Sequence, residues 1–181
     1  KVFTEIYDAW NSDTFFSLIK AFELPTNNQI KTFSRGMRMK AALTIALSHD
    51  AKLLILDEAT AGMDVSGREH VLEILEDYLG DDRAILISSH ISEDIEQLAT
   101  QLVFMRDGRI ILKESKEVLL SQYGIIDQPV EHFNISNEYL IATRRRNDRQ
   151  ISLVNNYQKV PDAQPLKTID DATKIIMRGE V

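Results

Sequence analysis

The first 124 residues alternate between short, wholly apolar runs and segments with apolar residues at helical spacing. Residues 53–56 and 84–87 are apolar without polar alternation. Such runs predict strands buried on both faces, as in a parallel sheet. Helical spacing predicts helices over residues 12–22, 35–48, 65–79, 92–100 and 115–123. Buried strands that alternate with helices predict an α/β layer architecture.

Local signals mark where several of these elements begin and turn. Ser12 or Asp13 is predicted to cap the first helix and Ser34 the second, because short polar side chains accept hydrogen bonds from free N–H groups of the first turn. Asp64 can cap the helix that follows it. The pair Asp107-Gly108 lies between two apolar segments and predicts a two-residue hairpin.

The composition changes after Gly124. Residues 138–143 and 150–154 predict two strands around a turn at residues 147–148, and residues 160–165 predict a loop. Thr168 is predicted to cap a last helix, which ends at Gly179. This part predicts a small α+β module appended to the α/β part.

Composition sets limits on the class of protein. The chain has 181 residues, of which 44% are hydrophobic and 27% charged, as is usual for a soluble globular protein. No apolar stretch approaches the roughly 20 residues that span a bilayer. Cysteine is absent, which excludes disulfides and thiolate metal sites. A formal net charge of −7 argues against general nucleic-acid binding, so no nucleic-acid partner is expected.

Two carboxylates, Asp57 and Glu58, follow directly after the first apolar run. Open α/β sheets bind ligands at the carboxyl ends of their strands, so both acids are candidates for chemistry. One acid can hold a metal-bound water, and its neighbour, which points the other way, can accept a proton. The alternative is a strand that ends in a solvated acidic turn.

The segment Ser34-Arg35-Gly36-Met37 begins a predicted helix. A helix N-terminus attracts anions, and glycine lets the backbone approach a ligand closely. Arg35 and Arg38 lie in the first turn, where each cation opposes the helix dipole by ~0.3–1 kcal/mol. Their position favours a phosphate as neighbour; the alternative is a pair of solvated arginines.

His90 follows the second apolar run and Ser88-Ser89. An imidazole at this position can donate to a phosphate oxygen and respond to its loss. The alternative is a polar residue that merely ends a strand. The other histidines lack such a context and receive no role.

Four features stand in a fixed order: residues 33–37, residues 53–58, residues 61–64 and His90. Together they resemble the signature motif, the Walker B strand, the D-loop and the switch histidine of the ATP-binding cassette family of P-loop ATPases. The resemblance covers residues 1 to about 115. It implies a P-loop NTPase-like α/β fold with a helical signature subdomain.

The resemblance also implies roles for the acid pair and the histidine. Asp57 would hold Mg²⁺, mainly through water, and Glu58 would act on the attacking water. His90 would contact the γ-phosphate. ATP and Mg²⁺ are the implied cofactors.

A second set of residues would act on ATP bound to the opposite subunit. By resemblance, Ser34, Arg35, Gly36 and Met37 would cap its γ-phosphate, and Asp64 would lie at the dimer interface. Arg35 and Met37 replace the commoner Gly and Gln of the motif, and this form resembles the cassettes of ABC-2-type exporters.

The resemblance predicts three regions: a helical signature subdomain at residues 1–50, a RecA-like core portion at 51–124 and an accessory module at 125–181. No Gly-x-x-x-x-Gly-Lys-Ser/Thr phosphate loop occurs in the sequence. In family order this loop precedes the signature motif. The expectation is therefore a cassette truncated at its N-terminal side, which binds ATP and Mg²⁺ incompletely and does not hydrolyse ATP alone.

Three classes of function remain open at this point. The leading hypothesis is an ATP-binding subunit of an exporter, at the cytoplasmic face of the cell membrane, partnered by an integral-membrane permease and by a second nucleotide-binding domain in a head-to-tail dimer. The second is a soluble cassette ATPase that acts on ribosomes or DNA, for which the arginine cluster at residues 144–149 is the one supporting feature. The third is a non-catalytic binding module.

Overall fold

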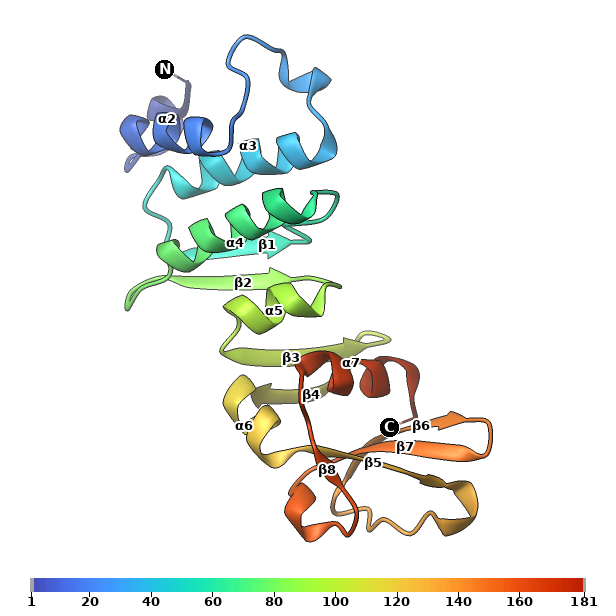
Figure 1. Cartoon of the computed structure of the whole chain (residues 1–181). Helices are drawn as coiled ribbons and strands as arrows, with labels where there is room; N and C mark the ends of the chain where they lie inside the picture. Colours follow the sequence, from blue (N-terminus) through green and yellow to red (C-terminus); the bar gives the residue numbers. More distant parts are fainter. Residues whose placement is uncertain (1, 181) are drawn as a thin grey trace. The chain divides into compact units, whose positions relative to one another are not determined.

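A computed structural model describes residues 2–180. They form two compact units, the first ending at Asp94 and the second beginning at Ile95 (Figure 1). These units follow from packing within the chain. The three predicted regions follow from motifs, and their boundaries at residues 50 and 124 stay a prediction.

The first unit carries the helices and the parallel strand pair that the sequence predicts. Its elements are α1 (Val2–Ile6), α2 (Ser12–Ala21), η1 (Ile30–Thr32), α3 (Arg35–Leu47), β1 (Leu53–Asp57), α4 (Val65–Tyr78) and β2 (Ala84–Ser88). Helix α5 (Ser92–Leu98) begins in this unit and ends in the next.

Two of the three predicted caps of this unit are confirmed. The Ser34 Oγ accepts a hydrogen bond from Met37 N at 3.2 Å, and the Asp64 Oδ1 accepts one from Gly67 N at 2.8 Å. The prediction for α2 is wrong by one residue, because Asn11 and not Ser12 or Asp13 caps this helix. Asparagine is as good a capping residue as either, so local propensity does not separate them.

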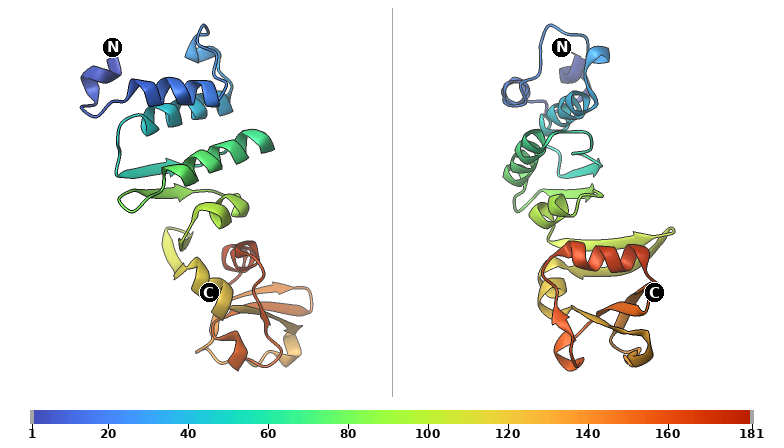
Figure 2. Two further views of the ribbon diagram at one scale, coloured as in Figure 1. Left: turned by 60° about the vertical axis from the view of Figure 1, so that its left-hand side comes forward. Right: turned by 45° about the vertical axis from the view of Figure 1, so that its right-hand side comes forward.

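Strands β1 and β2 pair in parallel, with Leu53 opposite Ala84 and Asp57 opposite Ser88. The predicted burial of both faces is wrong, because burial alternates along β1: Leu54 is 4% exposed, whereas Ile55 is 71% exposed. Successive side chains of a strand point to opposite faces. Helix α4 lies on one side of the pair (Figure 2), and the other face is open within the described residues.

The second unit combines a hairpin, a four-stranded sheet and the last helix. Its elements are β3 (Gln101–Arg106), β4 (Arg109–Ser115), α6 (Lys116–Gln122), β5 (Gly124–Pro129), η2 (Val130–His132), β6 (Leu140–Arg146), β7 (Arg149–Val154), η3 (Tyr157–Lys159), β8 (Gln164–Pro165) and α7 (Ile169–Arg178). The β3–β4 turn has positive φ at Asp107 (50°) and Gly108 (73°), which confirms the predicted hairpin.

The four strands are antiparallel and lie in the order β6-β7-β5-β8. Thr168 and Asp171 form a capping box at the start of α7, as its predicted cap requires. The prediction of a loop at residues 160–165 is wrong at its end, where β8 pairs with β5. No helix within residues 2–180 combines the length and the apolar composition needed to cross a membrane.

Candidate functional site

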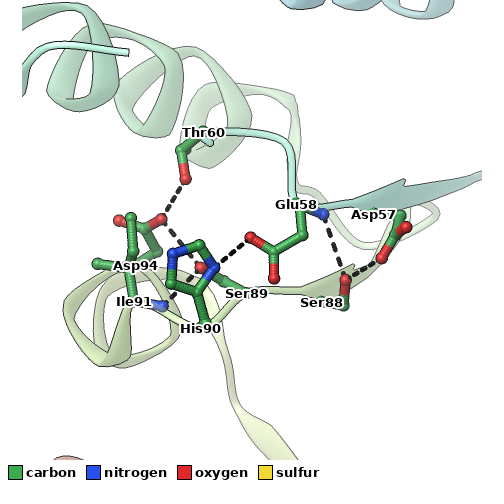
Figure 3. Close-up of polar contacts among 8 residues, drawn as sticks. All are labelled: Asp57, Glu58, Thr60, Ser88, Ser89, His90, Ile91 and Asp94. Atoms are coloured by element: carbon green, nitrogen blue, oxygen red, sulfur yellow. Dashed lines mark hydrogen bonds and ion pairs between the residues drawn. The ribbon is translucent and has the colours of Figure 1, made fainter. Parts of the chain in front are cut away.

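The acid pair lies where the two parallel strands of the first unit end (Figure 3). The Ser88 hydroxyl donates to Asp57 Oδ1 at 2.5 Å. The Glu58 N–H donates to Ser88 O at 3.1 Å and lies 3.2 Å from Ser88 Oγ. Ser88 of β2 therefore holds both Asp57, the last residue of β1, and Glu58, which follows it.

Glu58 has a left-handed backbone conformation, with φ of 52°. This conformation costs a residue with a side chain about 1 kcal/mol or more. The backbone hydrogen bonds to Ser88 stabilise it, together with a bond from Ala61 N to Glu58 O at 3.0 Å. The turn directs the Glu58 side chain away from Asp57, as the sequence argument requires for two different roles.

The Glu58 carboxylate meets the His90 ring, with 2.5 Å between Glu58 Oε2 and His90 Nδ1 (Figure 3). An ionised carboxylate can only accept hydrogen bonds, so the proton of this contact lies on Nδ1. The contact thus fixes the ring's tautomer and leaves Nε2 for another partner. The side chain of His90 is 70% exposed, so a ligand can reach it.

The predicted anion-binding residues lie at the start of α3, against the loop of residues 61–64. Gly36 is buried, and a Cβ built on it would lie 3.4 Å from both Gly62 O and Met63 Cγ. Gly62 has φ of 79°, and a Cβ there would lie 3.1 Å from Arg35 Cδ. Gly62 therefore permits the close approach of these two segments, whereas a Cβ at Gly36 would make ordinary van der Waals contacts.

The structure brings the predicted site residues together in two groups. Asp57, Glu58 and His90 gather around Ser88 at the strand ends. Ser34 and the residues up to Met37 lie beside the 61–64 loop, whose Asp64 caps α4. Their roles in catalysis and binding stay predictions.

Sequence reasoning missed Asp94, which is fully buried beside the first group. The Thr60 hydroxyl donates to Asp94 Oδ2, Ser89 Oγ lies 3.3 Å from the same oxygen, and Arg68 Nε lies 3.4 Å from Asp94 Oδ1. A signal was present in the sequence: Asp94 occurs among the apolar positions Ile91, Ile95 and Leu98 of a short amphipathic segment.

The donor atoms near Asp57 suit Mg²⁺. Asp57 is exposed and its neighbour Ser88 supplies a hydroxyl, so the donors are oxygens, which a hard cation prefers. Residues 2–180 include no group of three His, Asp or Glu side chains that would hold a metal by themselves. Mg²⁺ commonly takes one or two protein oxygens and completes its shell with water and phosphate, so Asp57 fits a cation shared with a nucleotide.

Comparison with known proteins supports the resemblance to ATP-binding cassettes. Residues 5–61 match the family model described as ABC transporter. The chain is 37% identical over 116 residues to the lantibiotic transport ATP-binding protein SrtF of Streptococcus pyogenes, which covers 64% of this chain and 47% of the relative. It is 34% identical over 100 residues to the Nod factor export ATP-binding protein I of Rhizobium johnstonii, covering 55% of this chain and 32% of the relative.

Solved structures show the same fold. A putative cobalt transport ATP-binding protein superposes with a TM-score of 0.57 at 19% identity, over 81% of this chain and 53% of that protein. A dimeric ATP-binding cassette bound to ADP and Pi superposes with a TM-score of 0.51 at 18% identity, over 57% of this chain and 46% of that one. These neighbours show that the chain has a partial P-loop NTPase-like α/β fold.

The chain spans about half the length, or less, of the curated relatives it matches. Within this span, the motif order, the strand pair and the matched relatives agree. Residues 5–61 match the ABC transporter family model, and the relatives and the fold support the interpretation of this chain as part of an ABC nucleotide-binding domain.

Proposed function

We propose that this chain is part of the ATP-binding subunit of a transporter that exports a compound across a membrane. The observation that carries the proposal is the cluster of Asp57, Glu58 and His90 around Ser88, at the carboxyl ends of two parallel strands. The names of the relatives, which include lantibiotic transport and Nod factor export, support transport as the work coupled to ATP.

Each member of the cluster has a distinct part in ATP hydrolysis. Asp57 would hold Mg²⁺, which would supply positive charge against the phosphates. Glu58 takes a proton from the attacking water, for which it must lie within hydrogen-bond reach. His90, held by Glu58 through Nδ1, presents Nε2 to the γ-phosphate.

The second group of residues acts across a dimer interface. Ser34 caps α3, and the remaining free N–H groups at that helix end favour a phosphate. Arg35, Gly36 and Met37 complete the surface that closes on ATP held by a second nucleotide-binding domain. Asp64, beside this surface, couples the two sites.

The membrane partner is an integral-membrane permease, and the subunit works at the cytoplasmic face of the cell membrane. The residues Arg35 to Met37 resemble the motif of ABC-2-type exporters, which supports export over import. A soluble ATPase of ribosomes or DNA is the second candidate, because four arginines lie within residues 144–149.

The test is to extend the chain by the coding sequence that precedes residue 1 and to measure ATP turnover with and without this extension. We expect turnover only in the extended protein, because no phosphate loop occurs within the 181 residues. In the extended protein Glu58→Gln should lower kcat by about 100-fold or more, with ATP binding retained. Glu73→Gln, an exposed acid on α4, is the matched control and should leave kcat unchanged.

The outcomes separate the classes of function. Mg²⁺-dependent turnover by the 181-residue chain alone, abolished by Glu58→Gln, would overturn the expected inactivity. A permease reading frame beside the extended gene selects transport, and a phosphate loop without such a frame favours the soluble ATPase. No phosphate loop in the preceding sequence would make the chain a non-catalytic module.

A further inference from the structure

We propose that Asp94 is a positioning residue that joins the loop after β1 to the loop after β2, so that Glu58 and His90 face each other. The catalytic role of Glu58 and His90 rests on the proposed function, whereas the contact between their side chains is present in this chain. Asp94 contacts neither Glu58 nor His90 directly in the hydrogen bonds of the site, so it acts through its neighbours.

The contacts of Asp94 join three segments at one buried carboxylate, and Figure 3 shows those with Thr60 and Ser89. Thr60, which donates to Oδ2, lies two residues after Glu58. Ser89, 3.3 Å from the same oxygen, directly precedes His90. Arg68 reaches Oδ1 from α4 at 3.4 Å. One carboxylate thereby fixes both chain segments that carry the reactive side chains.

The loop that carries His90 is fixed further by Ser89. The Ser89 Oγ accepts a hydrogen bond from Ile91 N at 3.0 Å, so its own proton is free for Asp94. Ser89 thus links the backbone of Ile91, the residue after His90, to the buried carboxylate of Asp94. The ring of His90 is exposed, and its position therefore depends on this backbone rather than on packing.

Stability alone does not explain a buried acid at this position. Removing a carboxylate from water is costly, and well-packed apolar residues often replace buried ion pairs without loss of stability. Arg68 Nε and Asp94 Oδ1 are both buried and form no well-directed hydrogen bond with each other. An apolar residue in place of Asp94 would remove the hydrogen bonds that link Thr60 to Ser89.

The experiment reads the tautomer of His90 by ¹⁵N NMR of the 181-residue chain, at a pH where the imidazole is neutral. A His90→Asn variant assigns the ring signals, and Glu58→Ala defines the ring without its partner. In the wild-type chain the proton should reside mainly on Nδ1. In Asp94→Ala the ring proton of His90 should distribute between Nδ1 and Nε2 as it does in Glu58→Ala, because the two loops are no longer held together.

Two comparisons exclude a general loss of structure. Asp94→Asn keeps an acceptor for Thr60 and should retain part of the Nδ1–H population, whereas Asp94→Ala should retain none above the Glu58→Ala level. Glu93→Gln removes the same charge from an exposed neighbour and should match the wild type. If Asp94→Ala fails to fold, Thr60→Ala and Ser89→Ala each remove one link and should each lower the Nδ1–H population.

A wild-type tautomer in folded Asp94→Ala, or in both single-link variants, would overturn the proposal, as would a wild-type chain without the Nδ1–H form. None of these results depends on ATP hydrolysis. Failure of the positioning role can therefore be told apart from failure of the proposed ATPase function.

Discussion

The two units of this chain bury their apolar residues to different extents. The second unit encloses a continuous core, in which Leu119, Leu153 and Ile176 are fully buried. In the first unit the strand pair buries Leu54 but exposes Ile55 and Leu86 by 71% and 60%. The strand pair of the first unit therefore leaves one face open, whereas the second unit has a continuous core and exposes large apolar side chains chiefly on its β3–β4 hairpin, at Val103, Met105 and Ile110.

The two units also differ in what their polar groups contact. In the second unit they close the structure: Arg106 donates to the carbonyl oxygens of Ile176 and Gly179 at the end of α7, and Glu180 pairs with Thr143 of β6 through two backbone hydrogen bonds. In the first unit the hydrogen bonds of Ser88 and Asp94 hold the strand ends and loops that carry the predicted site residues. The polar contacts of the second unit therefore link its secondary-structure elements to one another, whereas those of the first unit gather where its two parallel strands end.

The largest effect expected from this comparison is on the core of the second unit. Ile176→Ala should lower the free energy of unfolding of this unit by about 2–5 kcal/mol, because the side chain is fully buried and leaves a cavity. Urea unfolding followed by NMR signals from each unit measures the effect. The signals of residues 1–94 should keep their midpoint if the two cores are independent.

Met177→Ala is the matched control on the same helix, because Met177 is 44% exposed and should change the stability by about 0.5 kcal/mol or less. Equal shifts in both units for Ile176→Ala would show one cooperative structure. The two units would then not unfold independently.

The parts of the fold that depend on neighbours in sequence could be predicted. Ser34, Asp64 and Thr168 cap helices because a cap needs only a polar side chain and the N–H groups that follow it. The Asp107-Gly108 hairpin depends on two residues that tolerate positive φ. Burial could not be predicted, since an apolar run gives no information on whether another segment covers each face.

Strand β5 and the buried contacts of Asp94 were missed for a related reason. Strand β5 contains Gly124, Asp127 and Pro129, which have low strand propensity, and it forms because β7 and β8 pair with it. Asp94 meets Thr60 across 34 positions of sequence. The positions of Asp57, Glu58 and His90 could be predicted, because carboxyl ends of neighbouring parallel strands meet at one edge.

A smaller effect is expected at Tyr123, which closes the second unit at the end of α6. Its hydroxyl donates to Glu114 Oε2 at 3.2 Å. Burial, followed by the charge of Glu114, raises the pKa of Tyr123 from 10.0 to about 12. Tyr123→Phe should cost about 1 kcal/mol at neutral pH through the lost hydrogen bond.

The contribution of Tyr123 to the free energy of unfolding depends on pH. Because the pKa of Tyr123 is raised in the folded state, its stabilising contribution is complete below pH 10.0 and is lost as pH rises towards about 12. The stability advantage of the wild type over Tyr123→Phe should therefore shrink across this range, as measured by urea unfolding at each pH. A constant difference would contradict the buried, neutral hydroxyl.

The smallest effect is expected on the open face of β1. Ile55→Thr should change the free energy of unfolding of the first unit by about 0.5 kcal/mol or less, because Ile55 is 71% exposed and threonine keeps the β-branched shape that strands favour. Its neighbour Leu54 is 4% exposed, so Leu54→Ala should cost about 2–5 kcal/mol and provides the scale for the comparison. Both values come from urea unfolding at low protein concentration. A loss of 2 kcal/mol or more in Ile55→Thr would show that another surface covers this face of β1 in solution. The first unit would then not differ from the second in the exposure of its sheet.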